Sequence, residues 1–375
     1  MSSTGLQLRS LVKASAELEL SLVEVPVPAP AADEVIIRVE ATPLNPSDLG
    51  LLFGAADLNS GQASGTAEAP IVHFSIPERS MRAMQGRLGQ SMLVSNEGAG
   101  TVISAGESPA AQALLGKRVA TYGGGMYVQF HCTRTSQCIV LPEGCTTAEG
   151  TSIFVNPMTA ICMLDNLRRD SHTALVHTAA TSNLGQMLNR LCQQEGIGLV
   201  NIVRSPAQVD LLRGMGAKYV CDSSTPSFTD DLTQALIETG ATLAFDAIGG
   251  GNLASQILSC MESAINRSAT GYSRYGSATH KQVYIYGALD PSQTILKRSF
   301  GPAFGVGGWL LPNYLAKVGE QARQQFQKQV LSGLQSIFAC RYSHEVSLAG
   351  ALQLEAIAAY SRPSTGGKYL INPTL

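Results

Sequence analysis

Apolar and polar positions alternate with two different periods along this chain, and the change falls near residue 148. Before that point, short stretches with a period of two, separated by Gly and Pro, predict strands. These stretches are 18–27, 34–40, 92–94, 101–104, 117–122 and 126–132. We therefore predict a β-rich, barrel-like domain, in which residues 54–90 form a long loop or insertion with at most one short helix.

Beyond residue 148, apolar runs that predict buried strands alternate with stretches of helical period. The predicted strands are 174–176, 199–203, 219–221, 241–248 and 283–286, and the predicted helices are 156–167, 184–192, 230–238, 252–261 and 312–332. This alternation predicts an α/β domain with a doubly wound parallel sheet and right-handed crossovers. Ligands bind past the carboxyl ends of such strands, so the residues that follow each strand are expected to meet in one crevice.

The stretch from Thr173 to Asp222 predicts a βαβ unit whose turn could hold a phosphate. That turn, HTAATSNLG at 177–185, consists mostly of small side chains, and Gly185 allows the first helical turn to pack closely on the strand. Asn183 is a residue that tolerates the left-handed backbone conformation. The N–H groups at the start of the helix favour an anion. Only one glycine of G-x-G-x-x-G is present, so an ordinary βα turn remains the alternative.

The residues after the second strand of this unit predict the choice of dinucleotide. An NAD site usually has Asp or Glu there, which accepts hydrogen bonds from the ribose hydroxyls. This chain has Arg204 followed by Ser205. Because a guanidinium suits a 2′-phosphate, we predict NADPH rather than NADH. The alternative is a solvated arginine at the end of a strand.

Composition and charge argue against several classes of partner. The 375 residues are 45% hydrophobic and 14% charged, with a formal net charge of −2, so no basic surplus favours nucleic acid or an anionic membrane. No apolar stretch reaches transmembrane length, and the first residues lack the apolar core of a secretory signal. The eight cysteines are scattered without a C-x-x-C. We expect reduced, mostly buried thiols and a cytoplasmic protein.

Several motifs, taken in order, resemble the zinc-independent branch of the medium-chain dehydrogenase/reductase superfamily, above all its quinone oxidoreductases and 2-enoyl thioester reductases. The motifs are EVIIRVEATPLNPSD (34–48), NEGAG (96–100), GKRVATYGGGMYVQF (116–130), NPMTA (156–160), HTAATSNLG (177–185), VNIVRS (200–205), FDAIGGG (245–251), VYIYGAL (283–289) and TGGKYLI (365–371). The resemblance implies a GroES-like catalytic domain at 1–148 and 312–375, a Rossmann NADP-binding domain at 149–311, and a homodimer.

The resemblance also implies roles for individual residues. Asn45 would contact the nicotinamide and substrate region, and Asn156 and Thr159 would lie beside the nicotinamide. The diphosphate would be cradled by Thr178, Ala179, Ala180, Thr181, Ser182, Asn183, Leu184 and Gly185, and the 2′-phosphate would be held by Arg204 and Ser205. The nicotinamide half would be lined by Ile248, Gly249, Gly287, Ala288 and Leu289. Trp309 and Lys368 would lie near the cofactor, although packing between domains is an equal alternative for Trp309.

The chain departs from the family in its candidate acid and metal ligands. Many members have a tyrosine about a dozen residues after NPSD, proposed as the acid in enoyl reduction, and none occurs in LGLLFGAADLNSG (49–61). The family's metal cysteine is replaced at Asn45, and Glu97 remains from the second ligand cluster without a histidine. His131 and Cys132 lack further ligands at suitable spacing. We predict no catalytic metal, and we assign no acid–base role to His177.

These residues favour hydride transfer by proximity from NADPH to a small-molecule acceptor, a quinone or a similar conjugated carbonyl. A quinone needs little acid assistance, because water can protonate the hydroquinone anion. One alternative is an NADPH-dependent reductase of enoyl thioesters or other α,β-unsaturated carbonyls. Another is an NADPH-binding structural or sensor protein without turnover, since the fold does not determine the function.

Overall fold

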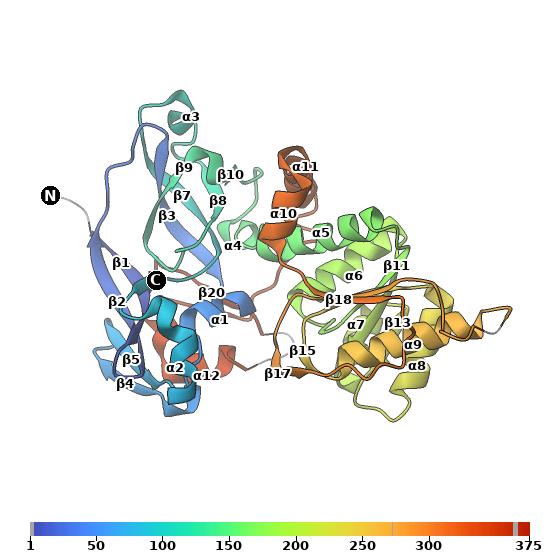
Figure 1. Ribbon diagram of the computed structural model, residues 1–375. Coiled ribbons are helices and arrows are strands. Elements are labelled where there is room, and N and C mark those ends of the chain that lie inside the picture. The colour runs from blue at the N-terminus through green and yellow to red at the C-terminus, as the bar shows by residue number, and fades with distance from the viewer. Residues whose placement is uncertain (1–3, 272, 363–366) are drawn as a thin grey trace. The chain divides into compact units, whose positions relative to one another are not determined.

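The computed structural model describes residues 4–271, 273–362 and 367–375. The chain forms two compact units: the first runs to Val155 and resumes at Ala339, and the second spans Asn156 to Phe338. The first boundary lies at residue 155, where the sequence suggests 148. The second lies at residue 338 and not at 311, because the helices between Leu311 and Ser332 belong to the second unit. The N-terminal part of the chain is blue and green in Figure 1, and the second unit runs from green to orange.

Two largely antiparallel sheets form the first unit, which is the GroES-like β-rich barrel domain. One sheet has the order β4 (Gln62–Gly65), β5 (Pro70–Ser75), β2 (Glu17–Pro26), β1 (Thr4–Lys13) and β6 (Ser91–Leu93). The other has the order β10 (Cys138–Val140), β8 (Arg118–Tyr122), β7 (Glu97–Ala105), β3 (Glu34–Pro43), β20 (Tyr369–Ile371) and β19 (His344–Val346), with β9 (Phe130–Arg134) also paired to β3. The connections carry α1 (Pro46–Phe53), α2 (Glu78–Met84), α3 (Pro109–Gln112), α4 (Thr147–Gly150) and α12 (Leu354–Tyr360), and the short turns η1 (Leu58–Ser60), η2 (Gln85–Arg87), η3 (Thr135–Gln137) and η4 (Gly350–Leu352).

A six-stranded parallel sheet forms the centre of the second unit. Its order is β13 (Tyr219–Asp222), β12 (Gly198–Val203), β11 (Ala174–His177), β14 (Leu243–Asp246), β16 (Lys281–Ile285) and β18 (Phe304–Gly308). Numbered as they occur in the chain, these strands have the order 3-2-1-4-5-6 of a Rossmann domain. The helices are α5 (Val155–Arg169), α6 (Asn183–Glu195), α7 (Pro206–Gly214), α8 (Phe228–Thr239), α9 (Leu253–Arg267), α10 (Leu311–Val318) and α11 (Glu320–Ser332), and β15 (Gly249–Gly251) pairs with β17 (Asp290–Thr294). The predicted fold class is confirmed.

The prediction that residues 54–90 form a loop with at most one helix is wrong. The segment contains the hairpin of β4 and β5, followed by α2. β5 also pairs with β2, and Val72, Phe74 and Ile76 lie in the core of the first unit. The period-two pattern of these three residues is the signal for a strand, and the surrounding Gly, Ala and Ser obscured it.

Other elements also differ from those expected. β1 pairs with β2 along ten residues, although the sequence did not predict a strand there. The Gly-rich stretch before Trp309 is the edge strand β18, which pairs with β16. The helix expected over 312–332 is broken into α10 and α11 at Gly319, whose φ of 85° lies in the left-handed region. In the motif TGGKYLI, Thr365 and Gly366 lie outside the described residues.

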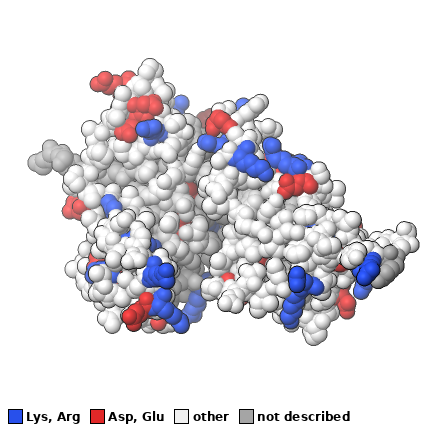
Figure 2. All heavy atoms as spheres, in the orientation of Figure 1, with Lys and Arg blue, Asp and Glu red and all other residues white. Residues whose placement is uncertain are grey.

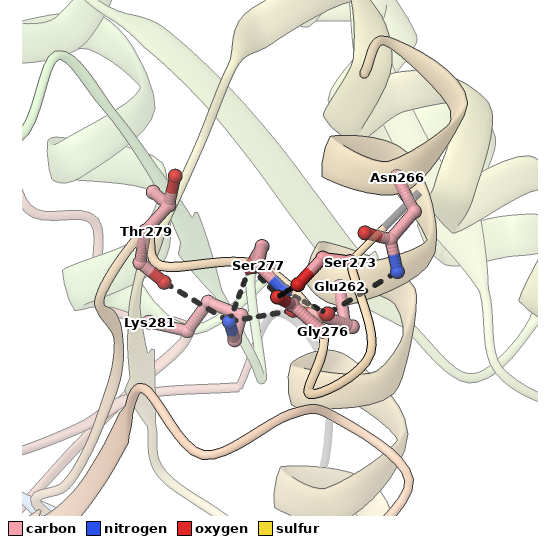
Figure 3. A network of polar contacts seen from close by, with 7 residues as sticks. All are labelled: Glu262, Asn266, Ser273, Gly276, Ser277, Thr279 and Lys281. Carbon is pink, nitrogen blue, oxygen red and sulfur yellow. Dashed lines mark hydrogen bonds and ion pairs between the residues drawn. The ribbon is translucent and has the colours of Figure 1, made fainter. Parts of the chain in front are cut away.

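A buried ion pair holds the segment after α9 in the second unit (Figure 3). The ammonium of Lys281 donates to Glu262 Oε2 at 2.6 Å, and also to Ser277 Oγ and to the carbonyl oxygen of Thr279. Ser277 donates to the same carboxylate through its N–H and its hydroxyl, at 2.7 and 2.6 Å. The Lys281 side chain is fully buried, so its charge is compensated by these contacts rather than by water.

Candidate functional site

The turn between β11 and α6 is built by contacts of backbone and small side chains. Ser182 caps α6, because its hydroxyl oxygen accepts the Gly185 N–H at 3.1 Å. A Cβ atom placed on Gly185 would lie 2.3 Å from the carbonyl oxygen of Ala180, so a larger residue would displace the turn. The left-handed residue is Ala179, with a φ of 51°. Asn183 is instead the first residue of α6.

The eight residues predicted to cradle a diphosphate divide into an inner and an outer set. Thr178 is inner: its buried hydroxyl donates to Asp246 Oδ1 and accepts the Ala247 N–H, both at 2.8 Å, and so ties β11 to β14. The other buried members of the eight are Ala180, Thr181, Leu184 and Gly185. Ala179, Ser182 and Asn183 reach the surface. An anion at this turn would therefore meet the outer set and the start of α6.

The two residues predicted to select the cofactor lie at the carboxyl end of β12, beside the strand that leads into the turn. Arg204 is exposed, and its backbone N–H donates to Gln208 Oε1 at 2.9 Å. Ser205 is the N-cap residue of α7, which begins with Pro206. Arg204 therefore follows its strand at the place where a Rossmann fold recognises the adenosine ribose.

A hollow of about 550 Å³ lies at the carboxyl ends of β16 and β18. It is lined by Ile285, Tyr286, Gly287, Ala288, Gly308, Trp309, Leu310 and Asn313. Three residues named from the sequence therefore meet here: Gly287, Ala288 and Trp309. A Cβ atom on Gly287 would lie 2.6 Å from the carbonyl oxygen of Ala247, so glycine permits the close approach of the two strand ends.

The other residues expected around the nicotinamide are not part of this lining. Gly249 pairs with Asp290 in the two-stranded ladder of β15 and β17, and Ile248 accepts the Asp290 N–H through its carbonyl oxygen at 2.9 Å. The Leu289 side chain is exposed. Sequence reasoning missed Tyr286, Leu310 and Asn313, although the first is the last residue of a predicted strand and so carried a signal.

Both aromatic residues of the hollow are held by their polar atoms. Trp309 Nε1 donates to Asn166 Oδ1 at 2.9 Å, and its ring meets the ring of Phe245 edge-on, with the centroids 5.7 Å apart. The Tyr286 hydroxyl lies 2.7 Å from His177 Nε2. Burial lowers the pKa of His177 to about 3, so this imidazole is neutral at physiological pH.

In the first unit, Asn45 joins two buried carboxylates. Its backbone N–H donates to Asp48 Oδ2 at 2.8 Å, and its amide donates to Glu97 Oε1 at 2.9 Å. Glu97 Oε2 in turn accepts the N–H groups of Phe154 and Val155, where α5 begins. Glu97 therefore caps the start of this helix. Burial raises the pKa of Asp48 to about 7.

Lys368 belongs to the same buried region of the first unit. Its ammonium donates to Ser152 Oγ at 2.9 Å and lies 5.5 Å from the centre of the Tyr342 ring.

Asn156 and Thr159 are buried near the start of α5, three residues apart and so on one face of the helix. The described residues contain no group of three or more His, Cys, Asp or Glu side chains that could hold a metal ion.

Charged side chains of both signs are mixed on one face of the surface. On the face drawn in Figure 2, basic and acidic side chains of the described residues lie interspersed over both units. Within the described part of the chain, no helix is both long and apolar enough to cross a membrane. All eight cysteines are free thiols.

Known proteins share parts of this sequence. No protein-family model matches the chain. The rat synaptic vesicle membrane protein VAT-1 homolog is 27% identical over 161 residues, which is 42% of this chain and 39% of that protein. The mitochondrial enoyl-[acyl-carrier-protein] reductase of Arabidopsis thaliana is 29% identical over 123 residues, 32% of each chain. The matched regions thus span less than half the length of these relatives.

Solved structures share the fold along the whole chain. One is a Mesorhizobium loti protein described as an NADPH:quinone reductase, which has a TM-score of 0.73 and is 24% identical. The match covers 100% of this chain and 99% of the Mesorhizobium loti chain. Another is a mutant enoyl thioester reductase from Candida tropicalis, which has a TM-score of 0.69 and is 17% identical. The match covers 99% of this chain and 100% of the Candida tropicalis chain. These solved structures are less than 25% identical to this chain, and what they share with it is the fold.

Proposed function

We propose that the protein is an NADPH-dependent oxidoreductase that transfers hydride to a quinone or a similar conjugated carbonyl without a metal. One observation carries this proposal: the turn before α6, Arg204 and the hollow all lie at the carboxyl ends of strands in a single 3-2-1-4-5-6 sheet. A dinucleotide needs an anion site, a ribose site and a site for a flat ring along one edge of such a sheet, and this unit offers all three.

The residues of the second unit suit each part of that cofactor. The start of α6, with Ala179, Ser182 and Asn183 at the surface, would hold the diphosphate. Arg204 and Ser205 would hold the 2′-phosphate, because a guanidinium offers paired donors to its oxygens. The hollow would take the nicotinamide ring, which supplies the hydride when it is bound.

We propose supporting roles for the remaining residues. Asn45 is fully buried, and its amide donates to Glu97. We therefore propose that Asn45 holds the start of α5, which carries Asn156 and Thr159, in position for the nicotinamide. Lys368 would stabilise the same region through Ser152 and the charge of Glu97. By resemblance, the first unit supplies the substrate side and the protein is a homodimer.

The class of acceptor is the finer part of the proposal. A quinone is favoured because the tyrosine proposed as the acid in enoyl reductases is absent from 49–61. An enoyl thioester is the second candidate, and it is favoured by the similarity to the Arabidopsis thaliana and Candida tropicalis enzymes. Turnover of NADPH with a small quinone and with crotonyl thioester, measured in parallel, distinguishes the two. Tight NADPH binding without turnover of either would favour a sensor or structural role.

The first test is a titration of the protein with NADPH and with NADH, repeated for Arg204→Ala. We expect NADPH to bind at least tenfold more tightly, and the preference to fall below about threefold in the variant, because a charge-assisted contact contributes about 1.5 kcal/mol or more. Arg79→Ala, which removes an exposed arginine from α2 in the first unit, is the matched control. If neither dinucleotide binds the unaltered protein, the proposal is wrong.

A further inference from the structure

Few polar side-chain atoms in the hollow at the ends of β16 and β18 are available to bind a ligand. The Tyr286 hydroxyl is engaged by His177, and the Trp309 indole N–H is engaged by Asn166. The backbone N–H of Trp309 is also used, because it donates to the carbonyl oxygen of Ile285 at 2.8 Å. The polar side-chain atoms of Tyr286 and Trp309 are therefore already engaged within the protein.

Asn313 is the exception among the side chains of this lining. It lies exposed in the first turn of α10, and its amide makes no side-chain hydrogen bond within residues 4–271, 273–362 and 367–375. A carboxamide is both a donor and an acceptor. Asn313 can thus form two hydrogen bonds to a group in the hollow without breaking a contact of the protein.

The start of α10 strengthens the same side of the hollow. Leu310 precedes the helix and cannot cap it with a side-chain oxygen, and Pro312 occupies the first turn. The N-terminus of this eight-residue helix carries partial positive charge that favours an acceptor oxygen. The helix end and the Asn313 amide together suit a polar oxygen of a ring that lies in the hollow, whose lining includes Tyr286 and Trp309.

We propose that Asn313 is a specificity-determining residue, whose amide binds the carbonyl oxygen of a planar conjugated group in the hollow. This inference rests on the proposed function. Two sources share that chemistry: the carboxamide of the nicotinamide, and the conjugated carbonyl of the hydride acceptor. In either case Asn313 selects for a carbonyl-bearing ring system, because an apolar analogue would leave the amide unpaired.

The test compares the unaltered protein with Asn313→Ala and Asn313→Asp. If the nicotinamide is the source, both variants bind NADPH about tenfold more weakly but bind 2′,5′-ADP, which lacks the nicotinamide, unchanged. If the acceptor is the source, the Kd for NADPH is unchanged and the KM for the quinone or crotonyl thioester rises about tenfold. Either result supports the proposal.

The matched control is Gln324→Ala, which removes an exposed amide from the neighbouring helix α11. Circular dichroism checks that each variant is folded. The inference is overturned if the unaltered protein binds and oxidises NADPH while Asn313→Ala retains both constants within twofold. It falls together with the proposed function if the unaltered protein binds no NADPH, so the two failures are distinguishable.

Discussion

The number of glycines in the turn before α6 does not show which single residues allow its backbone conformation. A G-x-G-x-x-G turn meets its need for space with three glycines, whereas this turn uses Gly185 for the close approach and places Ala179 at a φ of 51°. An L-residue in that conformation costs about 1 kcal/mol. The turn is thus built with small residues in place of two glycines.

Gly185→Ala is expected to destabilise the protein by about 2 kcal/mol and to weaken NADPH binding, because the new Cβ would lie 2.3 Å from a backbone oxygen. Gly214→Ala in α7 is the control, since its Cβ would meet no atom within 4 Å and alanine favours a helix. Urea unfolding and NADPH titration measure both variants. Equal effects of the two substitutions would contradict the role of Gly185.

The ion pair of Glu262 and Lys281 predicts a pH dependence of stability. Burial raises the pKa of Glu262, but hydrogen bonds from Lys281 and Ser277 outweigh this and lower it to about 2 from an ordinary value of 4.5. Because the pKa is depressed in the folded state, the carboxylate stabilises the protein above pH 4.5, and this contribution is lost as the pH falls toward 2.

Lys281→Met should therefore cost about 3 kcal/mol of unfolding free energy at pH 7, because it leaves the Glu262 carboxylate buried without its cation. Urea unfolding at pH 7 and at pH 3 measures the effect, and the difference between variant and unaltered protein should shrink at pH 3. Arg323→Met, which removes a cation from a largely exposed pair with Glu320, is the control and should change stability by less than about 1 kcal/mol. A difference that grows as the pH falls would refute the assignment.

At the scale of elements, the segment 54–90 behaves as part of the core rather than as an added loop. Phe74 on β5 is 1% exposed and meets the ring of Phe53 edge-on, with the centroids 5.8 Å apart. Phe74→Ala is expected to lower the unfolding free energy by about 3 kcal/mol. Ser75→Ala, at the exposed next position, should change it by less than about 0.5 kcal/mol. Similar values for both would show that β5 is not packed as described.

At the scale of the whole molecule, the second unit is continuous in sequence and has its own hydrophobic core. We expect residues 156–338 alone to fold, with a cooperative thermal transition in circular dichroism, because the sheet and its helices are all contained in this range. The first unit needs two separate segments, so residues 4–155 alone should lack β19 and β20 and fold poorly. A non-cooperative transition of 156–338 would contradict this view.

The alternation of the five central strands with helices in the second unit followed from the sequence, because a parallel sheet covered by helices needs continuous apolar strands and helices with one apolar face. Local patterns also located Arg204, Gly287 and Ala288 at strand ends. In the first unit, strands pair across long separations, and polar or glycine-rich residues at sheet edges carry little periodic signal. β4 in the first unit was missed for that reason, and so was the glycine-rich edge strand β18 in the second unit.

Only the tertiary structure decided which partners the named side chains contact. Thr178 and Asn45 have side chains suited to binding, yet the folded chain uses them on Asp246 and on Glu97. Asn313 lies in a helical stretch with no motif, and the start of α10 directly after β18 brings it to the lining of the hollow. Hydrogen-bond partners distant in sequence are set by how strands and helices pack, so the period of a pattern cannot specify them.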